Sequence, residues 1–320
     1  MNDLSDAGLS GPFSTLGKMP SRVLAIVNPA AGQDQPILKA LNAVFQKHNV
    51  DWDISITKAA GDGQRLAQEA AQAGVDLVVV HGGDGTVMEC ASGLVDSGIP
   101  MVIVPGGTAN VMARELGLPF DLKEAITLAV NPLAVIQSVD MGRMGDHFFL
   151  LRAGMGFEAD MVEGADRELK DRLGLLAYGL SALQALADPS VARYRLQIDG
   201  KEEESEGLAC IVANSGNLGA RGMVLSSIIN INDGLLDVLV VTKADLTSLV
   251  ALAASVVGGG QEPPVLQHWQ VREVTIESDP VQNVQVDGEI LTKTPVTIKV
   301  LPGAVKILVP PVEAIPNTST

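Results

Sequence analysis

The chain has 320 residues, more than the usual 100 to 200 or so of a single domain, so two domains are expected. Its formal net charge of -16 argues against nucleic acid as a partner and weakens electrostatic attachment to anionic lipid. The longest apolar run, residues 246–257, is shorter than the roughly 18 to 20 residues that a transmembrane helix needs, so we expect a soluble or peripheral protein without a transmembrane segment.

The N-terminal segment, residues 1–20, carries acids where a signal peptide carries bases, and it has no apolar stretch. We expect a flexible tail there. Cys90 and Cys210 show no CxxC or Cys/His metal spacing, which predicts free buried thiols in a reducing compartment. The expected location is therefore cytoplasmic.

Residues 21–137 alternate between apolar strands and helical patterns. "RVLAIV", "DWDISIT" and "VDLVVV" are predicted strands, and "PILKALNAVFQKHN" has helical apolar spacing. "DGQRLAQEAAQAG" is a predicted helix that is capped by Asp62 and stopped by Gly74. This alternation predicts an α/β domain with a parallel sheet.

Residues 138–302 have a different pattern. "SVDMGRMGDHFFLLRAGMGF" predicts a hairpin, and short strands separated by turn residues follow, which predicts a mainly antiparallel β-sandwich. Helical insertions are expected at about 167–186 and 244–257. The last strand, about 303–312, is a candidate for return to the first domain.

Two glycine turns follow predicted strands of the α/β domain. "HGGDGT" contains Gly82, Gly83 and Gly85, followed by Thr86, and "PGGTAN" contains Gly106, Gly107 and Thr108. A glycine turn between a strand and a helix exposes N–H groups at a positive helix end, where phosphate binds. Both turns are expected at the carboxyl edge of the sheet, where ligands bind in such folds.

Asp84 is unusual in a phosphate cradle because its charge repels the ligand unless it holds Mg²⁺ or accepts a proton. The alternative is that "DG" is only a type I′ turn. His81 is expected to be a packed strand-end residue. The absence of GxxxxGK[ST] excludes a P-loop enzyme, and a GxGxxA match at Gly154, Gly156 and Ala159 is a weak signal for dinucleotide binding.

Six segments then carry a resemblance, in this order along the chain: "VNPAAG", "GGDGTVMECASGL", "PGGTANVMARELGLP", "LGLLAYGLSAL", "INDGLLDVLVV" and "VDGE". Together they resemble the diacylglycerol kinase catalytic-domain family, which includes bacterial lipid kinases and sphingosine kinases. The resemblance implies a fold like that of NAD kinases, with an α/β nucleotide domain and a β-sandwich lipid-substrate domain. It also implies transfer of the ATP γ-phosphoryl group to a hydroxyl of diacylglycerol or a related lipid at the inner membrane face.

The resemblance also implies site residues. The nucleotide-contacting positions are Asn28, Thr57, Gly82, Gly83, Asp84, Gly85, Thr86, Gly107 and Thr108. Asp233, with main-chain oxygens of Asn230 and Leu235, resembles a magnesium site. Asp287 and Glu289 resemble an acidic pair with a proton-accepting role, and Asp84 is a further candidate for that role.

Two positions depart from the family pattern: Met88 stands where an asparagine is common, and Val111 stands at an aspartate position. The identity of the lipid therefore stays open, as do NAD kinase-like phosphorylation of a soluble acceptor and a non-catalytic nucleotide or lipid sensor. A homodimer is also open. The leucine-rich "DRLGLLAYGLSALQALA" suits either core packing or the wall of a lipid pocket.

Overall fold

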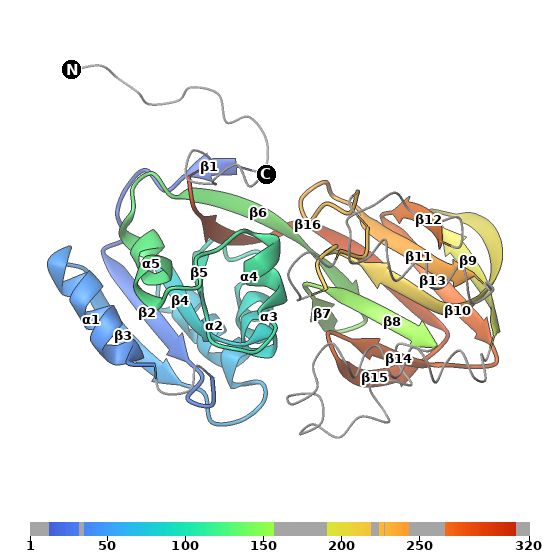
Figure 1. The fold of residues 1–320 in the computed structure, drawn as a ribbon, viewed down its shortest axis with the longest axis horizontal. Coiled ribbons are helices and arrows are strands. Elements are labelled where there is room, and N and C mark those ends of the chain that lie inside the picture. Colours follow the sequence, from blue (N-terminus) through green and yellow to red (C-terminus); the bar gives the residue numbers. More distant parts are fainter. Residues whose placement is uncertain are drawn as a thin grey trace, which may run out of the picture. The chain divides into compact units, whose positions relative to one another are not determined.

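The computed structural model describes residues 13–31, 35–156, 191–218, 224–226, 228–242 and 266–311. The chain forms two compact units, one made of Met1–Val139 with Gly303–Thr320 and the other of Asp140–Pro302. Strands β6 (Val135–Met144) and β16 (Val296–Val309) contribute residues to both units (Figure 1). The expected helical insertions and the leucine-rich segment lie outside the described residues.

The first unit contains a parallel sheet with the strand order β16-β5-β4-β2-β3. Its other strands are β2 (Arg22–Val27), β3 (Asp51–Ile56), β4 (Leu77–Gly82) and β5 (Pro100–Pro105). All six residues of β4 are buried, as expected of a central strand that is covered on both faces. The prediction of an α/β domain with a parallel sheet is confirmed.

Helices cover this sheet (Figure 1). They are α1 (Ile37–Lys47), α2 (Asp62–Gln72), α3 (Asp84–Leu94), α4 (Val111–Glu115), α5 (Leu122–Thr127) and a 3₁₀ turn at Leu128–Val130. Helix α1 buries Leu41, Val44 and Phe45, whose spacing places them on one helical face. Helix α2 packs against α3 and β2, while α5 packs against α1 and β5.

The predicted cap of α2 is wrong. Gly61, in the left-handed conformation, is the N-cap, and Asp62 is the first helical residue. The Asp62 carboxylate instead accepts hydrogen bonds from the N–H groups of Lys58 and Ala59, in the loop before the helix. Gly74, with φ 69°, follows the helix end as predicted.

The second unit is an antiparallel β-structure, as predicted, with the strand order β15-β14-β8-β10-β9-β13-β16 and with β11 pairing β10 and β12. Its further strands are β7 (His147–Phe149), β8 (Arg152–Gly156), β9 (Ala192–Ile198), β10 (Lys201–Ala213), β11 (Leu236–Thr242), β12 (Leu266–Val271), β13 (Glu273–Asp279), β14 (Asn283–Val286) and β15 (Glu289–Lys293). The predicted hairpin near Gly142 is β6–β7, in which Gly142 pairs with Phe149. Strand β12 was not expected.

Each side of this β-structure has a buried apolar cluster. The larger cluster contains Phe149 and Tyr194 from β7 and β9, and the smaller contains Ile211 and Leu239 from β10 and β11. Short β1 (Phe13–Thr15) pairs with β6 at residues of the first unit. In the described parts of the chain, every helix is too short or too polar to span a membrane.

Candidate active site

The turn after β4 has the strand–turn–helix geometry that the sequence predicts. Gly83 is the N-cap, and α3 begins at Asp84. Asp84 and Gly85 therefore lie in the first helical turn, so the interpretation of "DG" as a type I′ turn is wrong. Gly85 is exposed at this helix end, where N–H groups lack intrahelical partners and can bind an anion.

The second glycine turn touches the first. The Gly106 N–H donates a 2.9 Å hydrogen bond to the carbonyl oxygen of Gly82, which extends the pairing of β4 and β5. A Cβ atom added to Gly107 would lie 2.6 Å from the Cα atom of Gly83, a separation that real side chains do not reach. The contact between the two turns therefore requires glycine at position 107.

The side chain of Asn110 stabilises the second glycine turn through hydrogen bonds within the turn. Its backbone is left-handed, with φ 48°, and its buried side chain bonds Gly107 twice. The Gly107 N–H donates to Asn110 Oδ1 at 2.8 Å, and Asn110 Nδ2 donates to the Gly107 carbonyl at 2.6 Å. The Gly107 N–H is thus bonded inside the protein, whereas Thr108 beside it is exposed.

Asn28 joins the end of β2 to this site. Its Nδ2 donates a 2.9 Å hydrogen bond to Thr86 Oγ1 in the first turn of α3. Its backbone N–H bonds the carbonyl of His81, whose ring contacts the Val104 carbonyl at 3.2 Å. Burial lowers the pKa of His81, which is a packed strand-end residue as predicted. Thr57 is buried after β3, and its N–H bonds the Val27 carbonyl.

Asp84 points to the start of α4. Its Oδ1 accepts a 3.3 Å hydrogen bond from the Met112 N–H. Burial raises the pKa of Asp84, while N–H groups of Met112, Val111 and Asn110 oppose that rise. Val111, where the family pattern has aspartate, is itself buried. In this chain Asp84 therefore supports the amides that open α4.

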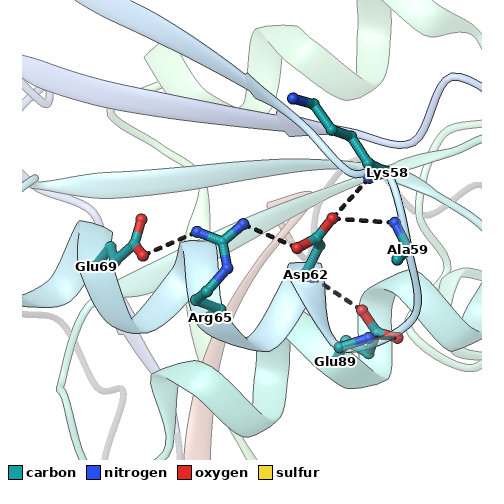
Figure 2. A network of polar contacts seen from close by, with 8 residues as sticks. Lys58, Ala59, Asp62, Arg65, Glu69 and Glu89 are labelled. Atoms are coloured by element: carbon teal, nitrogen blue, oxygen red, sulfur yellow. Dashed lines mark hydrogen bonds and ion pairs between the residues drawn. The ribbon is translucent and has the colours of Figure 1, made fainter.

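Glu89, five residues after Asp84 on α3, is a residue to which the sequence assigned no role. Its Oε1 and Oε2 accept hydrogen bonds from the N–H groups of Gly61 and Gly63, at 2.8 and 2.9 Å. Figure 2 shows Glu89 beside the start of α2, where Asp62 bonds the loop amides and Arg65. The guanidinium of Arg65 and these amides hold the pKa of Asp62 at about 2. Two glycines flanking Asp62 were the available sequence signal for this contact.

The "VDGE" motif lies in the second unit, at the β14–β15 hairpin. The Asp287 carboxylate accepts hydrogen bonds from three successive N–H groups, of Leu150, Leu151 and Arg152, at 2.9 to 3.2 Å. Burial raises the pKa of Asp287 to about 6, and the three amides and the Arg152 charge oppose the rise. Glu289 is exposed at the start of β15.

The "NDG" loop of the second unit is anchored by Asp140. This buried side chain accepts a 2.7 Å hydrogen bond from the Gly234 N–H, and the Asp140 N–H donates to the Ile231 carbonyl. Asp233 is exposed, and its Oδ1 accepts from the Leu235 N–H at 3.0 Å. Although the residue is exposed, its carboxyl is partly desolvated, which together with the nearby charge of Asp237 raises the pKa of Asp233.

Several other expected sites have simpler roles. Gly154 and Gly156 lie in β8, which pairs antiparallel with β10 and β14, so they do not open a βαβ unit; Ala159 lies outside the described residues. Cys90 and Cys210 are buried and form no disulfide, as predicted. A cavity of about 170 Å³ beside α2 is lined by residues that include Arg22, Trp52 and Leu66, but by none of the predicted site residues.

The described residues thus gather the predicted side chains in three places. In the first unit, the predicted side chains follow neighbouring parallel strands. Asn28 follows β2, Thr57 follows β3, Asp84 and Thr86 follow β4, and Thr108 follows β5. In the second unit, Asp287 and Glu289 share one hairpin, whereas Asp233, Asn230 and Leu235 share a separate loop. Among the side chains that the structure describes, no three His, Cys, Asp or Glu converge as a metal site.

Comparison with known proteins matches the two units to two known domains. Residues 22–144 match the model of the diacylglycerol kinase catalytic domain, and residues 152–309 match that of the YegS C-terminal NAD kinase beta sandwich-like domain. A Pseudomonas putida protein named "Probable lipid kinase YegS-like" is 32% identical, over 84% of this chain and 90% of its own. The Bacillus subtilis protein named diacylglycerol kinase is 26% identical, over 84% of this chain and 89% of its own.

A solved structure agrees with this assignment. The crystal structure of a diacylglycerol kinase from Bacillus anthracis has 30% sequence identity and a TM-score of 0.75, and the match covers 92% of this chain and 99% of that one. The shared fold is therefore the α/β unit followed by the β-sandwich. The chain belongs to the diacylglycerol kinase catalytic domain family, and it is an enzyme of the kinase class.

Proposed function

We propose that the protein is an ATP- and magnesium-dependent lipid kinase, which transfers the γ-phosphoryl group to a hydroxyl of diacylglycerol or a related lipid. The observation that carries this proposal is the backbone contact between Gly83 and Gly107 at the carboxyl edge of β4 and β5. Beside this contact, Gly83 and Gly85 at the start of α3 carry no side chain, so an anion can approach the N–H groups of the helix end. The names of the Bacillus subtilis and Pseudomonas putida relatives support a lipid as the acceptor.

The nucleotide would be bound by the two glycine turns and by hydroxyls beside them. Thr86 lies in the first turn of α3, already bonded to Asn28, and Thr108 is exposed in the second turn. Both hydroxyls can donate to phosphate oxygens. Thr57 lies further along the same edge, after β3, where its buried side chain would border the nucleotide.

The lipid hydroxyl must lose its proton as its oxygen attacks the phosphoryl group, so the reaction needs a proton acceptor. A carboxylate would take this role. Glu289 is exposed and can reach a substrate, whereas both oxygens of Asp287 bond backbone amides. Asp84 is the third candidate, with a carboxyl that burial keeps more basic than usual. We propose all three as functional residues.

The residues of the "NDG" loop fit a magnesium ion in their chemistry. The Asp233 carboxylate and the main-chain oxygens of Asn230 and Leu235 are hard oxygen donors, which Mg²⁺ prefers, usually with one or two carboxylates and several waters. When bound, Mg²⁺ would supply positive charge that offsets the Asp233 carboxylate and holds the loop.

The test is ATP consumption with and without Mg²⁺, using diacylglycerol, monoacylglycerol, sphingoid and ceramide-like acceptors dispersed in vesicles. We expect turnover with at least one lipid and none without Mg²⁺. Faster turnover of NAD than of every lipid would select the NAD kinase-like alternative. ATP or lipid binding in calorimetry, without transfer under any magnesium condition, would select the non-catalytic sensor.

We also propose that the enzyme works in the cytoplasm, peripherally at the inner membrane face, because its acceptor would reside there. With a net charge of -16, contact with the membrane would be brief and mainly apolar. Cosedimentation with vesicles should therefore be weak and little changed by salt. A strong loss of binding at high salt would show an electrostatic mode instead.

A further inference from the structure

Asn214 lies directly after β10 and is fully buried. Its Nδ2 donates two hydrogen bonds of 2.8 Å, one to the carbonyl of Asp140 and one to the carbonyl of Leu150. Its backbone N–H donates a third bond to the carbonyl of Leu151. One side chain therefore joins β6 to the segment between β7 and β8.

The bond to Leu150 leads to the "DGE" carboxylate. The Leu150 carbonyl and the Leu151 N–H belong to the same planar peptide group. Asn214 bonds the carbonyl end of this group at 2.8 Å, while Asp287 bonds its N–H end at 3.2 Å. Because the peptide is planar, Asn214 fixes the direction from which the N–H reaches Asp287.

The bond to Asp140 leads to the "NDG" loop. The Asp140 carbonyl accepts from Asn214, and the Asp140 carboxylate accepts from Gly234 at 2.7 Å. The Asp140 N–H also bonds the Ile231 carbonyl. The loop that carries Asp233 is thus held at both ends by a residue whose own backbone is held by Asn214.

A contribution to folding stability does not explain why a polar side chain occupies this buried position. Asn214 Oδ1 is buried and has no hydrogen-bond partner, an arrangement that costs free energy relative to a well-packed apolar residue. The two donors of Nδ2, in contrast, are both used on carbonyls that lead to predicted functional loops. The polar group is therefore best explained by what it positions.

We infer that Asn214 is a positioning residue, which holds the amides that grip Asp287 and, through Asp140, the loop that carries Asp233. This inference rests on the proposed kinase function for its catalytic consequence. A substitution of Asn214 should therefore disturb both loops at once, although the "NDG" and "DGE" motifs lie more than 50 positions apart in the sequence.

The test uses Asn214→Asp and Asn214→Ala. The aspartate keeps the shape but places an oxygen against two carbonyl oxygens, and the alanine removes both donors. We expect kcat to fall by about 10- to 100-fold, as for outer residues of metal and catalytic sites, and the Mg²⁺ concentration for half-maximal rate to rise. The KM for ATP should change less than about twofold, because the proposed phosphate-binding turns belong to the first unit.

Ser205→Ala is the matched control. Ser205 is also buried on β10, and its hydroxyl donates one hydrogen bond of 2.6 Å to Gln267, outside the Asn214 contacts. This variant should lose similar stability but keep kcat and the Mg²⁺ dependence. If it reproduces the Asn214 variants at equal folded fraction, the positioning role is wrong.

Hydrogen–deuterium exchange gives a readout that needs no activity. Asn214→Ala should exchange faster at residues 150–152 and at Gly234 than either the wild type or Ser205→Ala. Unchanged exchange at both loops would overturn the inference. Asn214→Ser, which keeps one donor, should show intermediate exchange, and it replaces the other variants if they do not fold.

The two proposals can fail separately. A wild type that is inactive with every acceptor would refute the proposed function, while hydrogen–deuterium exchange would still show whether Asn214 holds both loops.

Discussion

The carboxylate of Glu89 accepts a 2.9 Å hydrogen bond from the N–H of Gly63, a residue 26 positions earlier in the chain. A Cβ atom on Gly63 would lie 2.8 Å from the Cβ of Glu89, so glycine permits this approach. Helix α3, which carries Asp84 and Thr86, thereby fixes the start of α2. The segment before α2, which contains Thr57, is fixed with it.

Replacing Glu89 by Gln should lower the free energy of unfolding by about 1 to 3 kcal/mol, because one amide nitrogen would face a backbone N–H donor. We also expect the KM for ATP to rise several-fold, since the segment with Thr57 would lose one of its anchors. Chemical denaturation and steady-state kinetics measure the two effects. Glu69→Gln is the control. The exposed carboxylate of Glu69 bonds only the exposed Arg65 side chain among described residues, so its loss should lower stability by less than about 0.5 kcal/mol.

Gly107→Ala and Gly85→Ala should separate folding from nucleotide binding. Alanine at 107 forces its Cβ against the Gly83 backbone, so we expect both stability and ATP affinity to fall. Alanine at 85 meets no atom within 4 Å and lies in a helix, so stability should hold or rise by up to about 1 kcal/mol. If phosphate approaches this helix end, ATP affinity falls for Gly85→Ala as well. Calorimetry showing unchanged affinity for Gly85→Ala would place the phosphates elsewhere.

The pKa of Asp287, about 6 in the folded chain against 3.8 ordinarily, predicts a pH dependence of stability. Between these values the folded state binds more protons than the unfolded state, so stability is greatest below pH 4 for this group and falls as the pH rises through 6. The fall is about 3 kcal/mol at most. Urea unfolding of the wild type and Asp287→Asn at pH 4.5 and 7.5 should detect about 2 kcal/mol of this fall. An equal pH response of the two proteins would contradict the raised pKa.

Asp84→Asn and Glu289→Gln should each reduce turnover by about 100-fold or more while the fold is kept. The asparagine retains an oxygen that can accept from the Met112 N–H, and Glu289 is exposed, so neither change should cost much stability. Rates in the lipid assay and circular dichroism at matched concentration measure both effects. Glu203→Gln, another exposed acid, should behave like the wild type. Near-wild-type rates in both test variants would remove these residues from the chemistry.

The sequence predicted the α/β unit well because its strands are continuous apolar runs and its helices have regular spacing. The turn at Gly83 was predictable for the same reason, since glycines interrupt a buried strand directly before a helix. The N-cap of α2 was not predictable, because the side chain of an aspartate near a helix start can accept hydrogen bonds either from N–H groups of the helix or from N–H groups of the preceding loop. Asp62 bonds backward, to Lys58 and Ala59.

The polar contacts between distant residues could not be read from the sequence. The pattern around Glu89 predicts only a helix, and Asn214 lies in the segment "GLACIVANS", which predicts only a short strand. Their partners are backbone groups, which leave no sequence signal apart from the two glycines that flank Asp62. Strand β12 was missed because Gln267 and Gln270 break its apolar alternation.

The bonds between Asn110 and Gly107 also bear on how a ligand would be received. Because the side chain of Asn110 already satisfies the donor and acceptor of Gly107, the second turn has its final shape before any nucleotide arrives. A preformed loop loses little conformational entropy on association, so more of the contact energy remains as affinity. The same rigidity narrows the choice of ligand, because a loop that does not adapt rejects a phosphate chain of different geometry.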